Sequence, residues 1–249
     1  MKEADGHGLV PLDEATVAAV NDALHESQVS GFRVADDGSV AELLVLVDTL
    51  PEAGPMEQAR RVVVMHDPSR IRIVLRRTGR GDDFYEGPML ILQDVAELDR
   101  FFAHHITWAH EMYSCDFLDG SAEHVADWPT TVSLELAFAT GRADHSLYWW
   151  VECGRNADDA VRSYWLQGFV EFGAVEVHDE LGTRVSLAAF GEGARRWWRA
   201  FHDGDARVGA EAQREARKSE GWQWWQAGRT SIAVPANAWP NRPGTDPRD

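Results

Sequence analysis

The sequence predicts an α+β protein made of two similar lobes, each an antiparallel β-meander closed by a helix. Short strand-like runs are separated by turn-forming residues, a helical apolar pattern follows each set of strands, and the second half repeats the order of the first. We place the first lobe at residues 1–120, the second lobe with an extra polar C-terminal helix at 128–228, and a mobile Pro-rich tail at 229–249.

The first half begins with a predicted helix and a buried strand. Residues 12–26 repeat apolar side chains at helical spacing, and Asp13 and Glu14 stand at the start, where the helix dipole favours acids. Residues 40–55 contain a Leu/Val run that ends in Pro and Gly, which is typical of a buried strand.

An arginine stripe is predicted on the next pair of strands. The turn sequence Asp67-Pro68-Ser69 divides residues 60–77 into the two strands of a predicted hairpin. On the second strand apolar residues alternate with arginines, so one face is expected in the core and the other carries Arg70, Arg72 and Arg76. Arg60 and Arg61 are candidates to lie across the hairpin. Such guanidinium groups could clamp carboxylates or phosphates; the alternative is a solvated face balanced by the chain's own acids.

The second half repeats the pattern of strands followed by a helix. Strands are expected over residues 130–139 and 145–154, and a hairpin over 168–190 that turns near Asp179–Gly182. The following helix, residues 191–204, carries one predicted buried stripe of Ala194, Trp197, Trp198 and Phe201. A helix over residues 205–221 is polar nearly all round, so it is expected to bridge or protrude.

The histidines of a long predicted helix, residues 94–116, could be metal ligands or neighbours of a core face. His104, His105 and His110 lie on three different faces of that helix. His104 shares a face with Glu111, but the two are separated by about 10 Å along the axis at 1.5 Å per residue, too far to bind one ion directly. We therefore predict no metal site and keep His104 and Glu111 as candidate pocket residues.

The chain is rich in tryptophan, with 11 in all. Trp149 and Trp150 are neighbours on a predicted strand, so they face opposite ways and one of them must leave the main core. Trp222, Trp224 and Trp225 follow the polar helix near the end of the chain. They are either exposed interface anchors or a cap folded back on the second lobe.

Composition limits the partners and the compartment. The 41 acidic residues outnumber the 24 Lys and Arg, and the net charge of −17 argues against nucleic acid or anionic membrane as a partner. Two cysteines, no secretory signal and no apolar run of about 20 residues indicate a cytoplasmic protein. The strong preference for Arg over Lys is typical of bacterial coding at high GC content.

Motifs for catalysis are not evident. There is no nucleophile elbow, P-loop or paired Cys motif, so we expect no catalytic residue and no cofactor, and lean against an enzyme. We predict a non-enzymatic interaction module of the immunity, inhibitor or adaptor type, which binds a protein through an acidic, Trp-rich surface. The alternatives are a small-molecule binder or enzyme with a pocket between the lobes, and a structural subunit of a larger assembly.

Overall fold

The computed structural model confirms an α+β fold with antiparallel sheets. It describes residues 12–25, 27–78, 87–105, 115–118, 128–153 and 163–218. These residues form helices and two five-stranded antiparallel sheets. No described helix is both long and apolar enough to cross a membrane.

The first sheet has the strand order β1-β2-β3-β9-β10. Its strands are β1 (Gln28–Val34), β2 (Val40–Thr49), β3 (Glu57–His66), β9 (Ala174–Asp179) and β10 (Arg184–Val185). The second sheet has the order β5-β7-β8-β4-β6. Its strands are β4 (Arg70–Thr78), β5 (Cys115–Leu118), β6 (Leu134–Ala137), β7 (His145–Cys153) and β8 (Ser163–Phe172).

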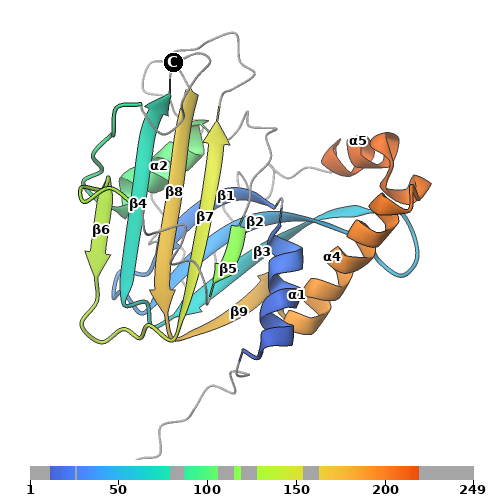
Figure 1. Cartoon of the computed structure of the whole chain (residues 1–249), viewed down its shortest axis with the longest axis horizontal. Coiled ribbons are helices and arrows are strands. Elements are labelled where there is room, and N and C mark those ends of the chain that lie inside the picture. The colour runs from blue at the N-terminus through green and yellow to red at the C-terminus, as the bar shows by residue number, and fades with distance from the viewer. Residues whose placement is uncertain are drawn as a thin grey trace, which may run out of the picture.

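The two sheets cross each other and enclose the main core (Figure 1). Helix α2 (Val95–His105) lies beside β1, whereas α1 (Glu14–Leu24), α4 (Leu187–His202) and α5 (Ala210–Lys218) gather on the right of that view. Trp149 is fully buried in the core and contacts Phe32 and Phe102. Trp150 points to the opposite face of β7 and stacks on Trp165 at 4.8 Å, so the predicted opposition of the two tryptophans is confirmed.

The turn predicted at residues 67–69 exists, but the hairpin predicted around it is wrong. Strands β3 and β4 belong to different sheets, and the turn carries the chain from one to the other. Gly173 likewise connects β8 in the second sheet to β9 in the first, and its N–H donates to the carbonyl of His66 at 2.9 Å. The N–H of Ser69 donates to the carbonyl of Glu171 at 2.8 Å. The two corners therefore satisfy each other's backbone groups, and β3 and β4 pair with β9 and β8 instead of with one another.

The division into two similar lobes, residues 1–120 and 128–228, is not confirmed. Each sheet combines strands from both halves of the chain, since β9 pairs with β3 and β8 pairs with β4. The turn predicted near Asp179–Gly182 is confirmed by the pairing of β9 with β10, but the hairpin predicted over residues 168–190 is too long, since β8 belongs to the second sheet and α4 begins at Leu187. The tail at 229–249 lies outside the described residues.

A β-bulge in β1 fits this edge strand to the core. The register shifts between Val29 and Gly31, so that Val29 pairs with Val45 and Phe32 pairs with Leu43. Both β1 side chains are fully buried, although three positions separate them, because the extra residue restores their common orientation.

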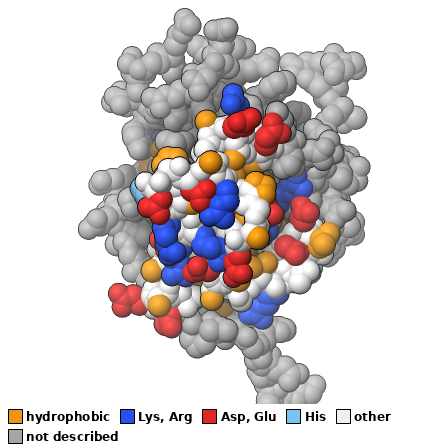
Figure 2. All heavy atoms as spheres, turned by 90° about the vertical axis from the view of Figure 1, so that its right-hand side faces the viewer, with side chains coloured by type: hydrophobic (Ala, Val, Ile, Leu, Met, Phe, Trp, Pro, Cys, Tyr) orange, Lys and Arg blue, Asp and Glu red, His pale blue; other side chains and the backbone are white. Residues whose placement is uncertain are grey.

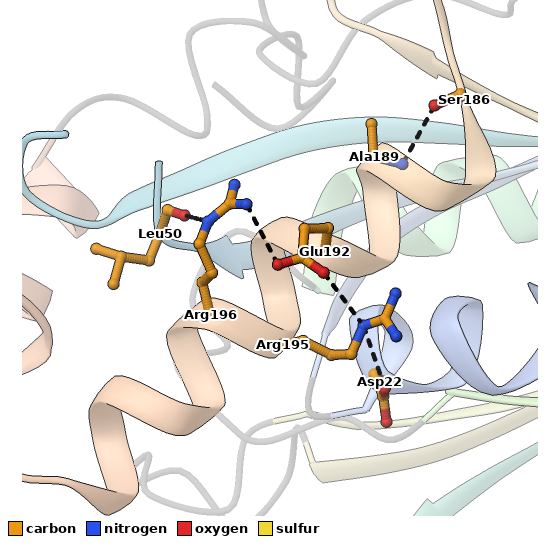
Figure 3. Close-up of polar contacts among 7 residues, drawn as sticks. All are labelled: Asp22, Leu50, Ser186, Ala189, Glu192, Arg195 and Arg196. Atoms are coloured by element: carbon orange, nitrogen blue, oxygen red, sulfur yellow. Dashed lines mark hydrogen bonds and ion pairs between the residues drawn. The ribbon is translucent and has the colours of Figure 1, made fainter. Parts of the chain in front are cut away.

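The helices start and stop at identifiable caps. The Asp13 side chain accepts a hydrogen bond from the N–H of Thr16 at the start of α1. Helix α4 begins at Leu187, earlier than predicted, because the hydroxyl of Ser186 accepts the N–H of Ala189 (Figure 3). The predicted polar C-terminal helix is present as α5, preceded by a short 3-10 helix, η3 (Ala206–Val208).

Candidate functional site

The arginines predicted on one face of a strand do share a face of β4. Ile71, Ile73 and Leu75 between them are buried in the main core. Each arginine of the stripe also has a partner within the chain. Arg70 donates from Nε to Glu135 at 2.8 Å, and Arg76 donates to the carbonyl of Gly87 at 2.8 Å.

Arg72 is held between a carbonyl and an aromatic ring. Its guanidinium donates to the carbonyl of Pro129 at 3.2 Å and lies 5.3 Å from the centre of the Trp128 ring. A ligand at Arg70, Arg72 and Arg76 would therefore have to compete with these contacts, and binding by the stripe stays a prediction. Arg60 and Arg61 lie on β3, in the other sheet, so they do not extend the stripe across a hairpin.

The other residues singled out from the sequence are separated from the stripe or undescribed. His104 is in the last turn of α2, and the helix predicted over residues 94–116 is wrong at its end, because Cys115–Leu118 form strand β5. Glu111, Trp222, Trp224 and Trp225 lie outside the described residues. Among the residues that the structure describes, no three His, Cys, Asp or Glu side chains gather as they would around a metal ion.

A different surface combines aromatic exposure with charge, and it is positioned by the packing of α1 on α4. The two helices run parallel, since Gly191 lies against Ala19 and Arg195 lies beside Asp22. A Cβ at Gly191 would be 2.4 Å from the carbonyl oxygen of Ala19, so only glycine permits this approach. Helix α1 ends at Leu24, whereas α4 continues to His202 and leaves its last turn uncovered by α1.

Polar contacts fix α4 against its neighbours (Figure 3). Arg195 Nε lies 3.9 Å from the carboxylate of Asp22 and 3.8 Å from that of Glu192. Arg196 donates from Nε to the carbonyl of Leu50 at 2.8 Å, and its Nη1 is 3.5 Å from Glu192. These contacts hold α4 to α1 on one side and to the segment after β2 on the other.

The exposed end of α4 carries a cluster of rings. Phe201 stacks on Trp197 with centroids 5.2 Å apart and an interplanar angle of 9°, yet 48% of Phe201 is exposed. The Trp198 ring lies 5.3 Å from that of His25 and 6.0 Å from that of His202. Phe201 was predicted to be buried with Ala194 and Trp197; this is wrong for Phe201, because no described element covers that part of α4.

A second small core lies beneath these rings. It contains Leu50, Met56, Trp197, Ala200, Val208 and Ala216, and so joins α4 to η3 and α5. Trp197 is therefore held in place by this second core, and the exposed Phe201 ring stacks on it. An aromatic ring held in this way loses little freedom when it enters an interface.

Two arginines flank the rings. Arg195 and Arg199 lie four residues apart and share a face of α4 with Trp198 and His202. Arg199 is exposed and makes no ion pair with any residue that the structure describes. We call the six residues of this surface the α4 patch: His25, Arg195, Trp198, Arg199, Phe201 and His202. Figure 2 shows charged side chains of both signs interleaved with apolar ones on this side of the molecule.

A charged cluster on the first sheet was not predicted from the sequence. Glu176 is 2.9 Å from Nε2 of His178, 3.8 Å from Nε2 of His66 and 3.2 Å from Nη1 of Arg184. Burial alone would raise the pKa of Glu176, but the His178 hydrogen bond, Arg184 and His66 together outweigh it and lower the pKa. The signal in the sequence is alternation, because Glu176 and His178 interleave with buried valines on β9.

Three further ionisable groups are buried near α2. Arg33 and Glu42 are direct cross-strand partners on β1 and β2, and Asp99 faces Arg33 from α2. Burial raises the pKa of Asp99 to about 6, opposed by Arg33 and Arg100. Burial also lowers the pKa of Arg33 to about 8, opposed by Asp99 and Glu42, so the guanidinium keeps its charge at neutral pH. Coulombic attraction between Arg33 and these two carboxylates links α2 to the edge of the first sheet.

The α4 patch is therefore the surface on which the described residues combine exposed rings with an unpaired cation. In the Glu176 group and in the Arg33 group, by contrast, mostly buried acidic side chains lie near arginines of the same chain. Comparisons with protein-family models, with curated proteins and with solved structures found no match to this chain.

Proposed function

We propose that the chain is a non-enzymatic interaction module, of the immunity, inhibitor or adaptor type, that binds a protein partner through the α4 patch. The observation that carries the proposal is the stacking of Phe201 on the buried Trp197 while 48% of Phe201 stays exposed. Aromatic and arginine side chains dominate the binding energy of protein interfaces, and both are present in this patch.

The composition supports the same class of function. A net charge of −17 favours solubility and favours association with partners of basic overall charge. The α4 patch combines aromatic rings with the exposed guanidinium of Arg199, and so differs from the acidic average of the chain. We also propose a cytoplasmic location, which the low cysteine content supports.

Affinity capture with matched variants tests the proposal. Tagged wild-type chain, the Phe201→Asp variant and the Leu181→Asp variant serve as baits in extract of the native host. Leu181 is 73% exposed and lies in the turn between β9 and β10, so it controls for the loss of any exposed apolar side chain.

We expect one partner to be retained by the wild type and by Leu181→Asp and to be lost with Phe201→Asp. Thermal unfolding of each bait shows that the folded state is kept. If no protein is retained specifically, or if Phe201→Asp retains the same protein equally well, the proposed function is wrong.

A further inference from the structure

The interface between α1 and α4 continues past the end of α1 as an open surface. Within the covered part, Asp22 of α1 places its carboxylate 3.9 Å from Arg195, and its carbonyl accepts the Trp198 indole N–H at 3.2 Å. At this contact an acidic residue of α1, Asp22, lies beside an arginine and an aromatic ring of α4.

Side chains of the same kinds, an arginine and an aromatic ring, recur one turn further along α4. Arg199 follows Arg195 by four residues, and His202 follows Trp198 by four residues, so the second pair lies directly beyond the first. Arg199 is exposed and makes no ion pair with a described residue, and His202 lies 6.0 Å from the Trp198 ring. An acid that would play the part of Asp22 is thus missing from the described residues at this position.

We infer that the α4 patch binds an acidic protein segment, which continues the line of α1 and sets a carboxylate against Arg199 and an apolar side chain on Phe201. The inference rests on the proposed function and names the chemistry of the partner. A guanidinium pairs with a carboxylate through two parallel hydrogen bonds, which gives direction as well as charge. The contact is continuous with the α1–α4 interface, so the segment meets a surface that is already ordered.

An acidic protein segment fits this patch better than a nucleic acid. A polyanion would be repelled along its whole length by a chain of net charge −17. A segment with one or two carboxylates meets mainly the local charge of Arg199, because Arg195 already lies beside Asp22 and Glu192 and charges beyond about 8 Å are screened at physiological salt. Phe201 adds an apolar contact that a phosphate backbone does not complement.

Site-directed cross-linking with defined peptides tests this chemistry. The probes are two short helical peptides with one pattern of Leu and Ala, one with aspartate and the other with lysine at the remaining positions. A carbodiimide joins carboxylates to amines, so the Arg199→Lys variant reports a carboxylate held at that position. Arg214→Lys is the matched control, because Arg214 on α5 is also exposed and without an ion pair to a described residue, yet has no aromatic neighbour in the α4 patch.

We expect the aspartate peptide to be cross-linked in Arg199→Lys about tenfold more than in Arg214→Lys, the ratio that 1.4 kcal/mol produces. Adding Phe201→Asp to Arg199→Lys should reduce the yield to that of the control. Equal yields at positions 199 and 214, or stronger competition for the patch by the lysine peptide, would overturn the inference.

The partner-capture experiment separates this inference from the proposed function. If a partner is lost with Phe201→Asp but fully retained by Arg199→Glu, the proposed acidic segment is wrong, whereas the proposed interaction module is not contradicted. A nucleic acid retained through Arg199 would overturn it as well. The absence of any partner would instead contradict the proposed function itself.

Discussion

Trp198 donates its indole N–H to the carbonyl oxygen of Asp22 at 3.2 Å, and this bond joins the end of α1 to the C-terminal part of α4. The carbonyl of Asp22 is among the last four of α1, which have no partner within their own helix. The same hydrogen bond therefore satisfies a terminal carbonyl of α1 and holds Trp198 of the α4 patch in place. Stability and the proposed binding therefore depend on the same contact.

Trp198→Phe should therefore weaken both the folded state and the proposed binding. The ring remains but the donor is lost, so we expect the free energy of unfolding to fall by about 1 kcal/mol, the usual net value of such a hydrogen bond. Urea denaturation measures the change. An unfolding free energy equal to that of the wild type would show that the bond does not contribute to the α1–α4 contact.

Gly191→Ala should push α1 and α4 apart. The new methyl group would be 2.4 Å from the Ala19 carbonyl oxygen, so the helices must shift, and overpacking of this kind costs about 1–3 kcal/mol. Thermal unfolding and urea denaturation report the loss. Gly209→Ala is the control, since its added methyl group would meet Ala206 at an ordinary 3.4 Å and its φ of −68° suits alanine. If both variants were equally stable, close helix contact at Gly191 would not matter.

Gly168→Ala should disturb the main core. Gly168 pairs directly with Trp149 across β8 and β7, and an added Cβ would lie 2.1 Å from the indole ring. We expect a loss of at least about 2 kcal/mol, since neither the ring nor the strand has room to move. Combining Gly168→Ala with Trp149→Leu should cost less than the sum of the two single changes, because the smaller side chain removes the clash. Strict additivity in a double-mutant cycle would contradict this packing.

The buried Asp99 should make stability depend on pH in the mildly acidic range. Its pKa in the folded protein is about 6, above the ordinary 3.8, so between about pH 4 and 6 the unfolded chain releases a proton that the folded chain keeps. The contribution of Asp99 to the free energy of unfolding therefore falls as pH rises through this range, by about 3 kcal/mol at most.

The Asp99→Asn variant isolates this effect. Urea denaturation at pH 4 and pH 6.5 should show the wild type losing stability relative to Asp99→Asn as the pH rises. Asp37 provides a control of opposite sign, because hydrogen bonds from the side chain and backbone of Ser39 lower its pKa. Relative to Asp37→Asn, the wild type should lose stability as the pH falls below about 4. A gap between wild type and Asp99→Asn that is constant with pH would show that Asp99 has an ordinary pKa.

Local patterns in the sequence predicted what local geometry decides. The alternation around Ile71 and Ile73 placed their neighbouring arginines on one face of β4, because side-chain direction along a strand depends only on the backbone. The turn at Asp67-Pro68-Ser69 was also found. The pairing of the two strands beside this turn was not predicted, because β3 and β4 pair with β9 and β8, which lie about a hundred residues further along the chain.

The α4 patch could not be predicted for a similar reason. The helical spacing of Trp197 and Phe201 is the same whether one ring or both are buried. In the structure α1 ends at Leu24 while α4 extends to His202, and the sequence of α4 alone does not contain this difference. The buried pair of Arg33 and Glu42 likewise depends on the register between β1 and β2, which a single strand sequence does not contain.

Titration calorimetry of the captured partner with the wild type, Phe201→Asp and Leu181→Asp tests the docking site at the end of α4. We expect Phe201→Asp to raise the Kd about 30-fold or more, as for an aromatic anchor worth about 2 kcal/mol, and Leu181→Asp to leave the Kd unchanged. Equal affinities for all three proteins would contradict a docking site at the end of α4.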